Sequence, residues 1–296
     1  MDANGHECCN TLPQRERESA QSYNDVRNTN NLRMNIMIND IRRIAAEAGD
    51  AIMKTYDGPA EVETKEDDSP LTQADRAAHN CIVGALAQLT PDIPVLSEES
   101  EGISTEERLG WKRFWLVDPL DGTKEFIKKT GQFTVNIALI ENGEPTIGVV
   151  LAPASGLEYF AARGNGAFKR LSQAEPVAIR VSEADNAKLR IVASRDHAGP
   201  KVAAMLEKLP NAELVSMGSS LKFCLVAEGA ADLYPRFVPT MEWDTGAAQC
   251  ILEEAGGAVC TLDGYRLAYG RKDLRNPSII AAGHPALDWK SLLQSD

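Results

Sequence analysis

The sequence predicts a mixed α/β fold arranged as two α/β lobes, and three observations support this prediction. Apolar residues recur at helical spacing over 41–53, which indicates an amphipathic helix. Strand-sized apolar segments follow, and Asn142-Gly143 between two of them is a strong signal for a hairpin turn. After about residue 180, short strands alternate with helices. We therefore expect one lobe over 34–180 and a second over 181–296.

The elements can be assigned in order along the chain. The first helix ends before Asp57-Gly58-Pro59, and Thr72 is well placed to cap a second helix over 73–89. The strands expected in the first lobe are 95–97, 114–117, 133–140, 146–151 and 157–162. In the second lobe we expect strands at 190–193, 213–216 and 232–234, with helices at 201–209, 221–228 and 246–255.

Residues 1–33 differ from the rest of the chain. They are polar, rich in Asn, Arg and Glu, and show no periodicity. Such a segment cannot bury enough apolar surface to offset the entropy lost on ordering. We expect a disordered or non-native N-terminal extension, with the folded part beginning near Met34.

Composition argues against several classes of protein. The chain has 31 Lys and Arg against 43 Asp and Glu, and this net charge of −12 disfavours nucleic-acid binding, which needs a basic surface. No apolar run approaches the ~20 residues of a membrane-spanning helix, and the run 133–140 is interrupted by Thr134 and Asn136. No secretory signal is visible, and none of the six cysteines forms a C-x-x-C pair. We therefore expect reduced thiols and a cytoplasmic location.

The most informative segment runs from Trp115 to Thr123. A buried strand is expected to end at Asp118, so that Asp118 and Asp121 project from its C-terminal end together with the Leu120 carbonyl. Carboxylate and carbonyl oxygens are the ligands that Mg²⁺ prefers. The alternative is an ordinary surface turn, because Asp-Pro and Asp-Gly are common turn pairs.

Other acidic residues lie in similar places. Glu98-Glu99 follows a predicted strand, Asp75 lies in the first turn of the second helix, and Asp244 precedes a late helix. Each has an ordinary explanation: a solvated loop end, a favourable helix dipole or an N-cap. Together they suit a phosphate-hydrolysing site with two or three metal ions. The chain lacks the G-x-x-x-x-G-K-[ST], G-x-G-x-x-G and G-x-S-x-G patterns, so we expect metal-activated water rather than a nucleophilic side chain.

These residues resemble a known family. Asp118-Pro-Leu-Asp121-Gly-Thr123-Lys-Glu-Phe126 and Trp243-Asp244-Thr-Gly-Ala-Ala248 are similar to the two signatures of the inositol monophosphatase superfamily. The finer resemblance, which extends from Met34 onward, is to its CysQ-type 3′(2′),5′-bisphosphate nucleotidase branch. It implies a layered αβαβα sandwich and a lithium-sensitive, Mg²⁺-dependent phosphatase. The implied reaction removes the 3′-phosphate of adenosine 3′,5′-bisphosphate in sulfur assimilation, with 3′-phosphoadenylyl sulfate as a further candidate substrate.

The resemblance also implies roles for individual residues. Two or three Mg²⁺ ions would be bound by Glu98, Asp118, Asp121, Asp244 and the Leu120 carbonyl. Asp75, Thr123 and Glu98 would activate the attacking water. The implied substrate contacts are Glu98, Leu120, Asp121, Gly122, Thr123 and Asp244 around the metal site and scissile phosphate, and Ser194, His197, Ser219, Ser220, Lys222 and Arg236 around the nucleotide and second phosphate.

Several alternatives stay open at this point. The chain could be an inositol monophosphatase or another sugar-phosphate phosphatase of the same superfamily, or a non-catalytic module that senses nucleotide or metal. Members of this branch in Gram-negative bacteria are described as associated with the cytoplasmic side of the inner membrane, although no basic amphipathic helix is evident here. The sequence leaves the oligomeric state and the preferred substrate undetermined.

Overall fold

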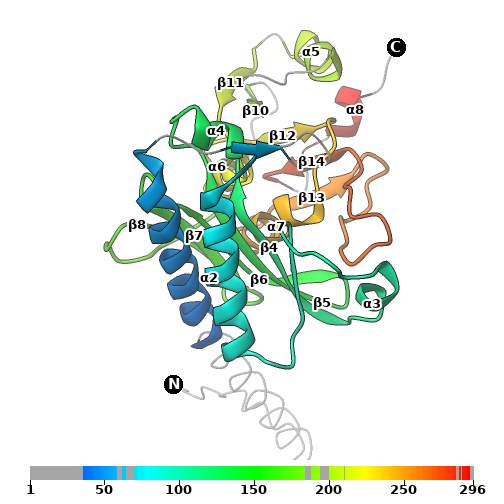
Figure 1. The fold of residues 1–296 in the computed structure, drawn as a ribbon. Helices are drawn as coiled ribbons and strands as arrows, with labels where there is room; N and C mark the ends of the chain where they lie inside the picture. The colour runs from blue at the N-terminus through cyan, green and yellow to red at the C-terminus, as the bar shows by residue number, and fades with distance from the viewer. Residues whose placement is uncertain are drawn as a thin grey trace, which may run out of the picture.

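The computed structural model describes residues 36–58, 62–64, 70–183, 188–193, 200–209, 211–284, 287 and 289–293. In these residues, helices and sheets stack in five layers, helix–sheet–helix–sheet–helix (Figure 1). The predicted layered α/β fold is confirmed. The expected N-terminal extension, residues 1–33, lies outside the described residues. No helix in the described part of the chain is long and apolar enough to span a bilayer.

A seven-stranded mixed sheet is the larger of the two main sheets. Its strands, in spatial as well as sequence order, are β3 (Val95–Ser97), β4 (Arg113–Asp121), β5 (Thr134–Glu141), β6 (Glu144–Ala152), β7 (Leu157–Ala162), β8 (Ala167–Leu171) and β9 (Val177–Ile179). β3 and β4 are parallel, and all later neighbours are antiparallel. Asn142 and Gly143 have φ angles of 52° and 81° and connect β5 to β6, as expected for the predicted hairpin.

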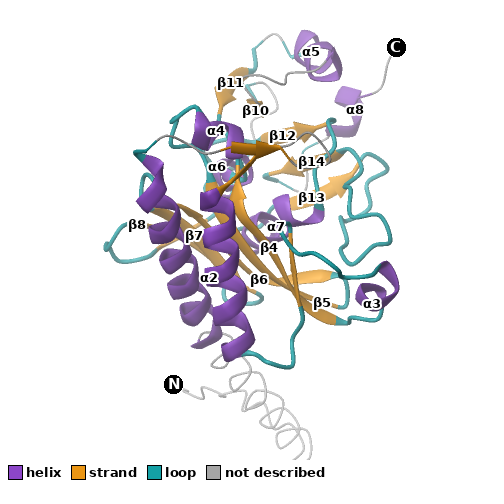
Figure 2. Ribbon diagram, in the orientation of Figure 1, coloured by secondary structure: helices purple, strands orange, loops and turns teal. Residues whose placement is uncertain are grey.

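Two long helices cover one face of this sheet (Figure 2). They are a helix over residues 36–56 and α2 (Gln73–Leu89), preceded by the small antiparallel ribbon of β1 (Val62–Thr64) and β2 (Pro70–Thr72). Ile44 and Ile82 pack from these helices against Trp115 and Val117 of β4. Thr72 caps α2, as its sequence predicted, by accepting hydrogen bonds from the backbone of Ala74 and Asp75.

The other face of the seven-stranded sheet packs against a middle helical layer and a second sheet. The middle layer contains α6 (Leu221–Ala227) and α7 (Gly246–Glu254). The second sheet has the order β11-β10-β12-β14-β13, formed by β10 (Arg190–Ala193), β11 (Glu213–Ser216), β12 (Leu233–Arg236), β13 (Ala258–Thr261) and β14 (Ile279–Ala282). The outer helical layer consists of α5 (Pro200–Glu207) and α8 (Trp289–Leu293). The lobe boundary near residue 180 stays a prediction. The helix α7, which belongs to the second expected lobe, packs against β5, β6 and β7 of the first sheet.

The structure also departs from the expected elements. The strand expected over 114–117 continues to Asp121, so the prediction that it ends at Asp118 is wrong. A short helix, α4 (Thr123–Ile127), follows β4. The sequence did not predict β8, β9, β13, β14 or the short helices α3 (Thr105–Leu109) and η1 (Glu242–Asp244). These elements are short, and their formation depends on tertiary neighbours rather than on a local apolar pattern.

An ion pair between the buried Asp232 and the partly exposed Arg190 connects β10 to the start of β12, and it gives a stability prediction. Asp232 is 2% exposed and accepts hydrogen bonds from Arg190 Nε (3.0 Å), Arg190 Nη2 (2.6 Å) and Ser182 Oγ (2.5 Å). Burial alone would raise the pKa of Asp232, but the hydrogen bonds from Arg190 and Ser182 lower it below its ordinary value. Asp232→Asn should therefore lower the free energy of unfolding by about 1–3 kcal/mol at pH 7.

The pH dependence of this effect has a definite sign. A carboxyl whose pKa is lowered on folding stabilises the protein above the unfolded pKa, roughly 3.9, and this contribution is lost as the pH falls through the lower folded value. Urea unfolding from pH 7 to pH 2 should show the wild type and Asp232→Asn converging at the acid end. Equal stabilities at pH 7 would contradict the assignment.

Candidate active site

Asp118 and Asp121 lie on the same face of β4 because the strand contains a bulge. Asp118 pairs with Asn136 and Asp121 with Thr134, so three steps along β4 match two steps along β5. In a regular strand, residues three apart point to opposite faces. The additional residue returns Asp121 to the face that Asp118 occupies, while Leu120 packs into the core beneath α2 and the helix over residues 36–56. The bulge thus makes the two carboxylates neighbours.

Further acids gather around this pair from separate elements. Asp118 is 1% exposed, and its pKa is raised well above the ordinary value, first by burial and then by the negative charges of Glu98, Asp121, Asp244 and Asp75. Burial, followed by the charge of Asp121, raises the pKa of Asp244 to about 8. The structure therefore brings together the acids of α2, the β3 end, β4 and η1 that the sequence singled out.

The donor set fits a hard divalent cation. Buried carboxylates with like-charged neighbours are costly unless a cation offsets them, and oxygen ligands suit Mg²⁺. In the described residues, no three Asp, Glu, His or Cys side chains already surround a common point suited to an ion. The assignment of Glu98, Asp118, Leu120, Asp121 and Asp244 as ligands therefore stays a prediction.

Ser220 connects the acidic cluster to the start of α6. Its backbone N donates to Asp121 Oδ2 at 2.6 Å, and its Oγ lies 2.7 Å from the same oxygen. Ser220 Oγ is also 2.8 Å from the Asp244 carbonyl oxygen and accepts from Asn136 Nδ2 at 2.8 Å. Thr134 Oγ1 lies 3.4 Å from Asp121 Oδ2. Through these contacts, β4, β5, α6 and η1 meet at one carboxylate.

Asp75 and Thr123 lie within hydrogen-bond reach of each other beside the acidic cluster. Asp75 is 2% exposed, and its Oδ2 accepts from the Thr72 backbone N (2.7 Å) and Thr72 Oγ1 (2.5 Å). Its Oδ1 faces Thr123 Oγ1 at 3.5 Å, and Thr123 Oγ1 lies 3.4 Å from the Leu120 carbonyl. Gly122, just before Thr123, has a φ of 93°, which disfavours any residue with a Cβ. A buried carboxylate thus orients a hydroxyl beside the acidic cluster.

This pair gives a prediction for catalysis. Thr123→Val keeps the shape of the side chain but removes the hydroxyl that Asp75 orients, so the rate of phosphate release should fall by about 100-fold or more. Thr123→Ser keeps the hydroxyl and should retain most of the rate. Steady-state assays of both variants test the pair, and equal activity of the valine and serine variants would contradict a role for the hydroxyl.

A pocket opens beside Asp121. It is lined by Asp121, Ser219, Ser220, Lys222, Phe223, Tyr234, Arg236, Thr240, Asp244 and Thr245. Lys222 is 7% exposed, and its amine lies 5.6 Å from the centre of the Tyr234 ring. Burial lowers the pKa of Lys222 to about 8, while the charge of Asp121 opposes this shift. The Nε atom of Arg236 is buried and has no hydrogen-bond partner among the residues that the structure describes. The pocket therefore offers two cations to an anionic group.

The structure describes some of the predicted substrate-binding residues, and others lie outside the described residues. It places Ser219, Ser220, Lys222 and Arg236 at one pocket with Asp121 and Asp244. Ser194 and His197 lie outside the described residues, so their predicted contact with the nucleotide stays a prediction. Asp244 is not the N-cap of α7, because it ends η1 and Thr245 takes the cap position.

The sequence analysis did not identify several residues of the site. They are Asn136 and Thr134, which contact Asp121, and Phe223, Tyr234, Thr240 and Thr245, which line the pocket. Thr134 and Asn136 did carry a signal, since they are polar positions two apart in an apolar strand and so share a face. The pocket residues carried none that distinguishes them from core or loop residues.

Comparisons with known proteins agree with this geometry. The chain matches the Inositol monophosphatase family over residues 36–294. It is 49% identical over 244 residues to the 3′(2′),5′-bisphosphate nucleotidase CysQ of Salmonella typhimurium, covering 81% of this chain and 97% of the relative. The CysQ protein of Haemophilus influenzae is 39% identical over 261 residues, covering 87% of this chain and 97% of that one.

Solved structures give the same result. The crystal structure of CysQ from Bacteroides thetaiotaomicron, a bacterial member of the inositol monophosphatase family, aligns with a TM-score of 0.73 and 41% identity, covering 83% of this chain and 96% of that one. An inositol monophosphatase from Thermotoga maritima aligns with a TM-score of 0.71 and 25% identity, covering 88% and 95%. The acidic cluster, the layered fold and these similarities together show that the chain belongs to the inositol monophosphatase family.

Proposed function

We propose that this protein is a Mg²⁺-dependent phosphatase that removes the 3′-phosphate of adenosine 3′,5′-bisphosphate and releases AMP, as a step in sulfur assimilation. The observation that carries the proposal is the position of Lys222 and Arg236, two cations that line the same pocket as Asp121 and Asp244. A substrate with two phosphates needs a second anion site away from the metal ligands. The names of the CysQ relatives support the same substrate.

The residues in and beside the acidic cluster would have two roles, metal binding and orientation of the attacking water. Asp118, Asp121, Asp244, Glu98 and the Leu120 carbonyl would hold two or three Mg²⁺ ions. Mg²⁺ held there would supply two effects, a lower pKa for its bound water and neutralisation of charge on the leaving 3′-oxygen. When the Thr123 hydroxyl donates its proton to Asp75, its oxygen can accept a hydrogen bond from the attacking water.

Lys222 and Arg236 would hold the 5′-phosphate. Fixing this second group places the 3′-phosphate at the carboxylates and so contributes orientation to the reaction. The same subsite would accept the 5′-phosphosulfate of 3′-phosphoadenylyl sulfate, which makes this compound a second candidate substrate. The implied partner is a small molecule.

The cytoplasmic location stays a prediction, as does the peripheral membrane contact described for the family. Cell fractionation would test both.

Two alternatives are less consistent with the site. An inositol monophosphatase needs no second cationic subsite, yet Lys222 is held at the pocket despite the cost of burying its charge. A non-catalytic module that senses nucleotide or metal would have no use for a hydroxyl oriented by a buried carboxylate, as in Thr123 and Asp75. The first observation favours a bisphosphate substrate, and the second favours catalysis.

The direct test compares phosphate release from adenosine 3′,5′-bisphosphate, adenosine 3′-monophosphate and inositol 1-phosphate with Mg²⁺. We expect preference for the bisphosphate and inhibition by Li⁺. Preference for inositol 1-phosphate would keep the metal chemistry but reject the nucleotide substrate. Absence of release from all three would reject the proposed reaction.

A further inference from the structure

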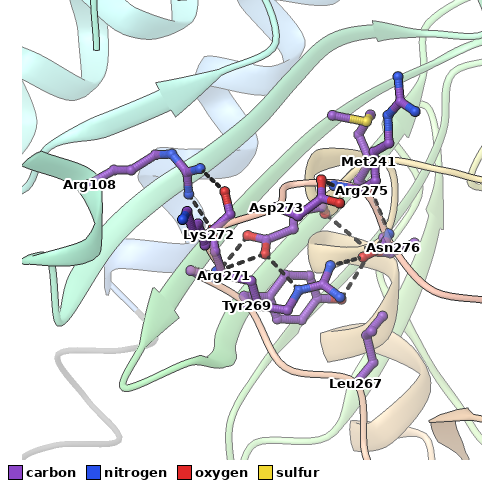
Figure 3. A network of polar contacts seen from close by, with 12 residues as sticks. Arg108, Met241, Leu267, Tyr269, Arg271, Lys272, Asp273, Arg275 and Asn276 are labelled. Atoms are coloured by element: carbon purple, nitrogen blue, oxygen red, sulfur yellow. Dashed lines mark hydrogen bonds and ion pairs between the residues drawn. The ribbon is translucent and has the colours of Figure 1, made fainter. Parts of the chain in front are cut away.

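A loop after β13 forms hydrogen bonds to the segment that carries Asp244. This loop, residues 269–276, is connected to η1 by a network of polar contacts in which Arg271 lies between Arg108 and Asn276 (Figure 3). The loop is formed by residues that follow η1 by about one helix and one strand in the chain, so its position depends on the tertiary fold. The network does not include substrate-pocket cations.

A continuous path of hydrogen bonds leads from Asp244 to Arg271. The Met241 backbone N donates to Asp244 Oδ2 at 2.8 Å, and the Met241 carbonyl accepts from Asn276 Nδ2 at 2.7 Å. Asn276 Oδ1 in turn accepts from Arg271 Nη2 at 2.5 Å. Asn276 is 5% exposed, so its amide is held inside the protein rather than by solvent. The direction of the Asp244 carboxylate is thus set through one backbone amide and one buried side chain.

Glu242 completes the network from the other side of Arg271. Glu242 is 0% exposed, and its Oε1 accepts from Arg271 N and Arg271 Nε, each at 3.0 Å, while its Oε2 accepts from Gly270 N at 2.8 Å. The Glu242 carbonyl accepts from Thr245 Oγ1 at 3.1 Å. Both ends of the Arg271 guanidinium therefore bind the segment 241–245, one through Glu242 and the other through Asn276.

Arg108 extends the network to the first half of the chain. Its guanidinium donates to the carbonyls of Arg271 and Lys272. Arg108 belongs to α3, which lies between Glu98 and Asp118 in the sequence. Arg271 is consequently the junction between the segment that carries Glu98 and Asp118 and the one that carries Asp244.

We propose that Arg271 is a positioning residue for the reaction, which fixes the direction of the Asp244 carboxylate toward the metal site through Asn276 and Glu242. Arg271 touches neither metal nor substrate, and it acts through Asp244. The proposal rests on the proposed function, because it requires Asp244 to bind Mg²⁺. A neutral side chain at 271 leaves the carboxylate in place but lets the segment 241–245 vary in direction.

The test measures Mg²⁺ binding to substrate-free protein by isothermal titration calorimetry. Arg271→Met should weaken Mg²⁺ binding by about 10- to 100-fold, the usual effect of losing a partner of a metal ligand. The matched control is Arg266→Met, because Arg266 also forms ion pairs, with Glu253 (2.6 Å) and Glu144 (2.5 Å), but does not contact the segment 241–245. The control should bind Mg²⁺ like the wild type, with melting temperatures measured for both.

A second pair of variants separates positioning from general stability. In an Asp244→Asn background, Arg271→Met should add less than about 2-fold to the loss of Mg²⁺ affinity, because both changes act through one ligand. If Arg271→Met does not fold, Arg271→Lys replaces it: one amine cannot bind Glu242 and Asn276 together, so affinity should still fall. The positioning role would be overturned if the losses of Mg²⁺ affinity from Arg271→Met and Asp244→Asn were additive. It would also be overturned if the Arg271 variants bound Mg²⁺ with wild-type affinity.

The outcomes also distinguish this inference from the proposed function. If Asp244→Asn leaves Mg²⁺ affinity unchanged, Asp244 is not a ligand, and both the metal assignment and the role of Arg271 fail. If Asp244→Asn weakens binding and Arg271→Met does not, the metal assignment stands and only the role of Arg271 fails.

Discussion

Asp121→Asn is expected to lower the rate of phosphate release from adenosine 3′,5′-bisphosphate by on the order of 1000-fold at saturating Mg²⁺. Asp121 is the carboxylate at which the elements of the site meet, because its Oδ2 binds the backbone N and Oγ of Ser220 while it lies beside Asp118. Asparagine has the same shape, but it lacks the negative charge that holds a divalent cation.

The control for this variant is Asp92→Asn, an exposed aspartate in the turn after α2, which should keep full activity. Thermal unfolding without metal tests whether misfolding is the cause. Removal of one charge from a cluster of like charges relieves repulsion, and the amide oxygen of asparagine can still accept from Ser220, so the melting temperature should not fall. Hydrolysis at near wild-type rates with saturating Mg²⁺ would be strong proof against the proposed site.

Lys222→Met is expected to raise the KM for adenosine 3′,5′-bisphosphate by about 30- to 100-fold, the effect of losing a charged hydrogen bond worth about 2–3 kcal/mol. Methionine retains the apolar stem that lies near Tyr234 but has no charge for the 5′-phosphate. The KM for adenosine 3′-monophosphate, which lacks that phosphate, should change little.

The matched control is Lys169→Met, because the Lys169 amine binds Glu228 at 2.6 Å and does not line the pocket. Steady-state kinetics of both variants with both nucleotides measure the difference. If Lys222→Met raised the KM for the two nucleotides equally, Lys222 would not bind the 5′-phosphate.

Local sequence patterns were sufficient to predict much of the fold. Thr72 caps α2 because its hydroxyl can reach the first free backbone amides, and Asn142-Gly143 turns because both residues tolerate a positive φ. The acids of the site were also visible, since each lies beside a predicted strand or helix start. Such features depend on residues close in the chain, so the sequence specifies them directly.

Features that depend on distant residues could not be predicted in this way. The pattern around Lys222 fits an exposed helix residue equally well, and only its neighbours Tyr234 and Arg236 show that the amine is buried. The support for Asp244 comes from Arg271 and Asn276, which follow it by more than 25 residues. Strict alternation would also have placed Asp118 and Asp121 on opposite faces of the strand.

The bulge in β4 interrupts the pairing with β5 at the acidic cluster, so it lowers stability at the site that the reaction needs. Deleting Pro119 would remove no acid and would allow β4 to pair regularly with β5 past Asp118, with one ladder position restored. In that shortened strand, alternation alone would still place the two acids on one face and the leucine between them on the other. The additional residue therefore contributes a local bend and a stronger twist of β4 at the acidic cluster rather than the choice of face. Selection for thermal stability alone would therefore favour a regular strand, whereas the phosphatase retains an irregular one, as in other trade-offs in which a functional site costs stability.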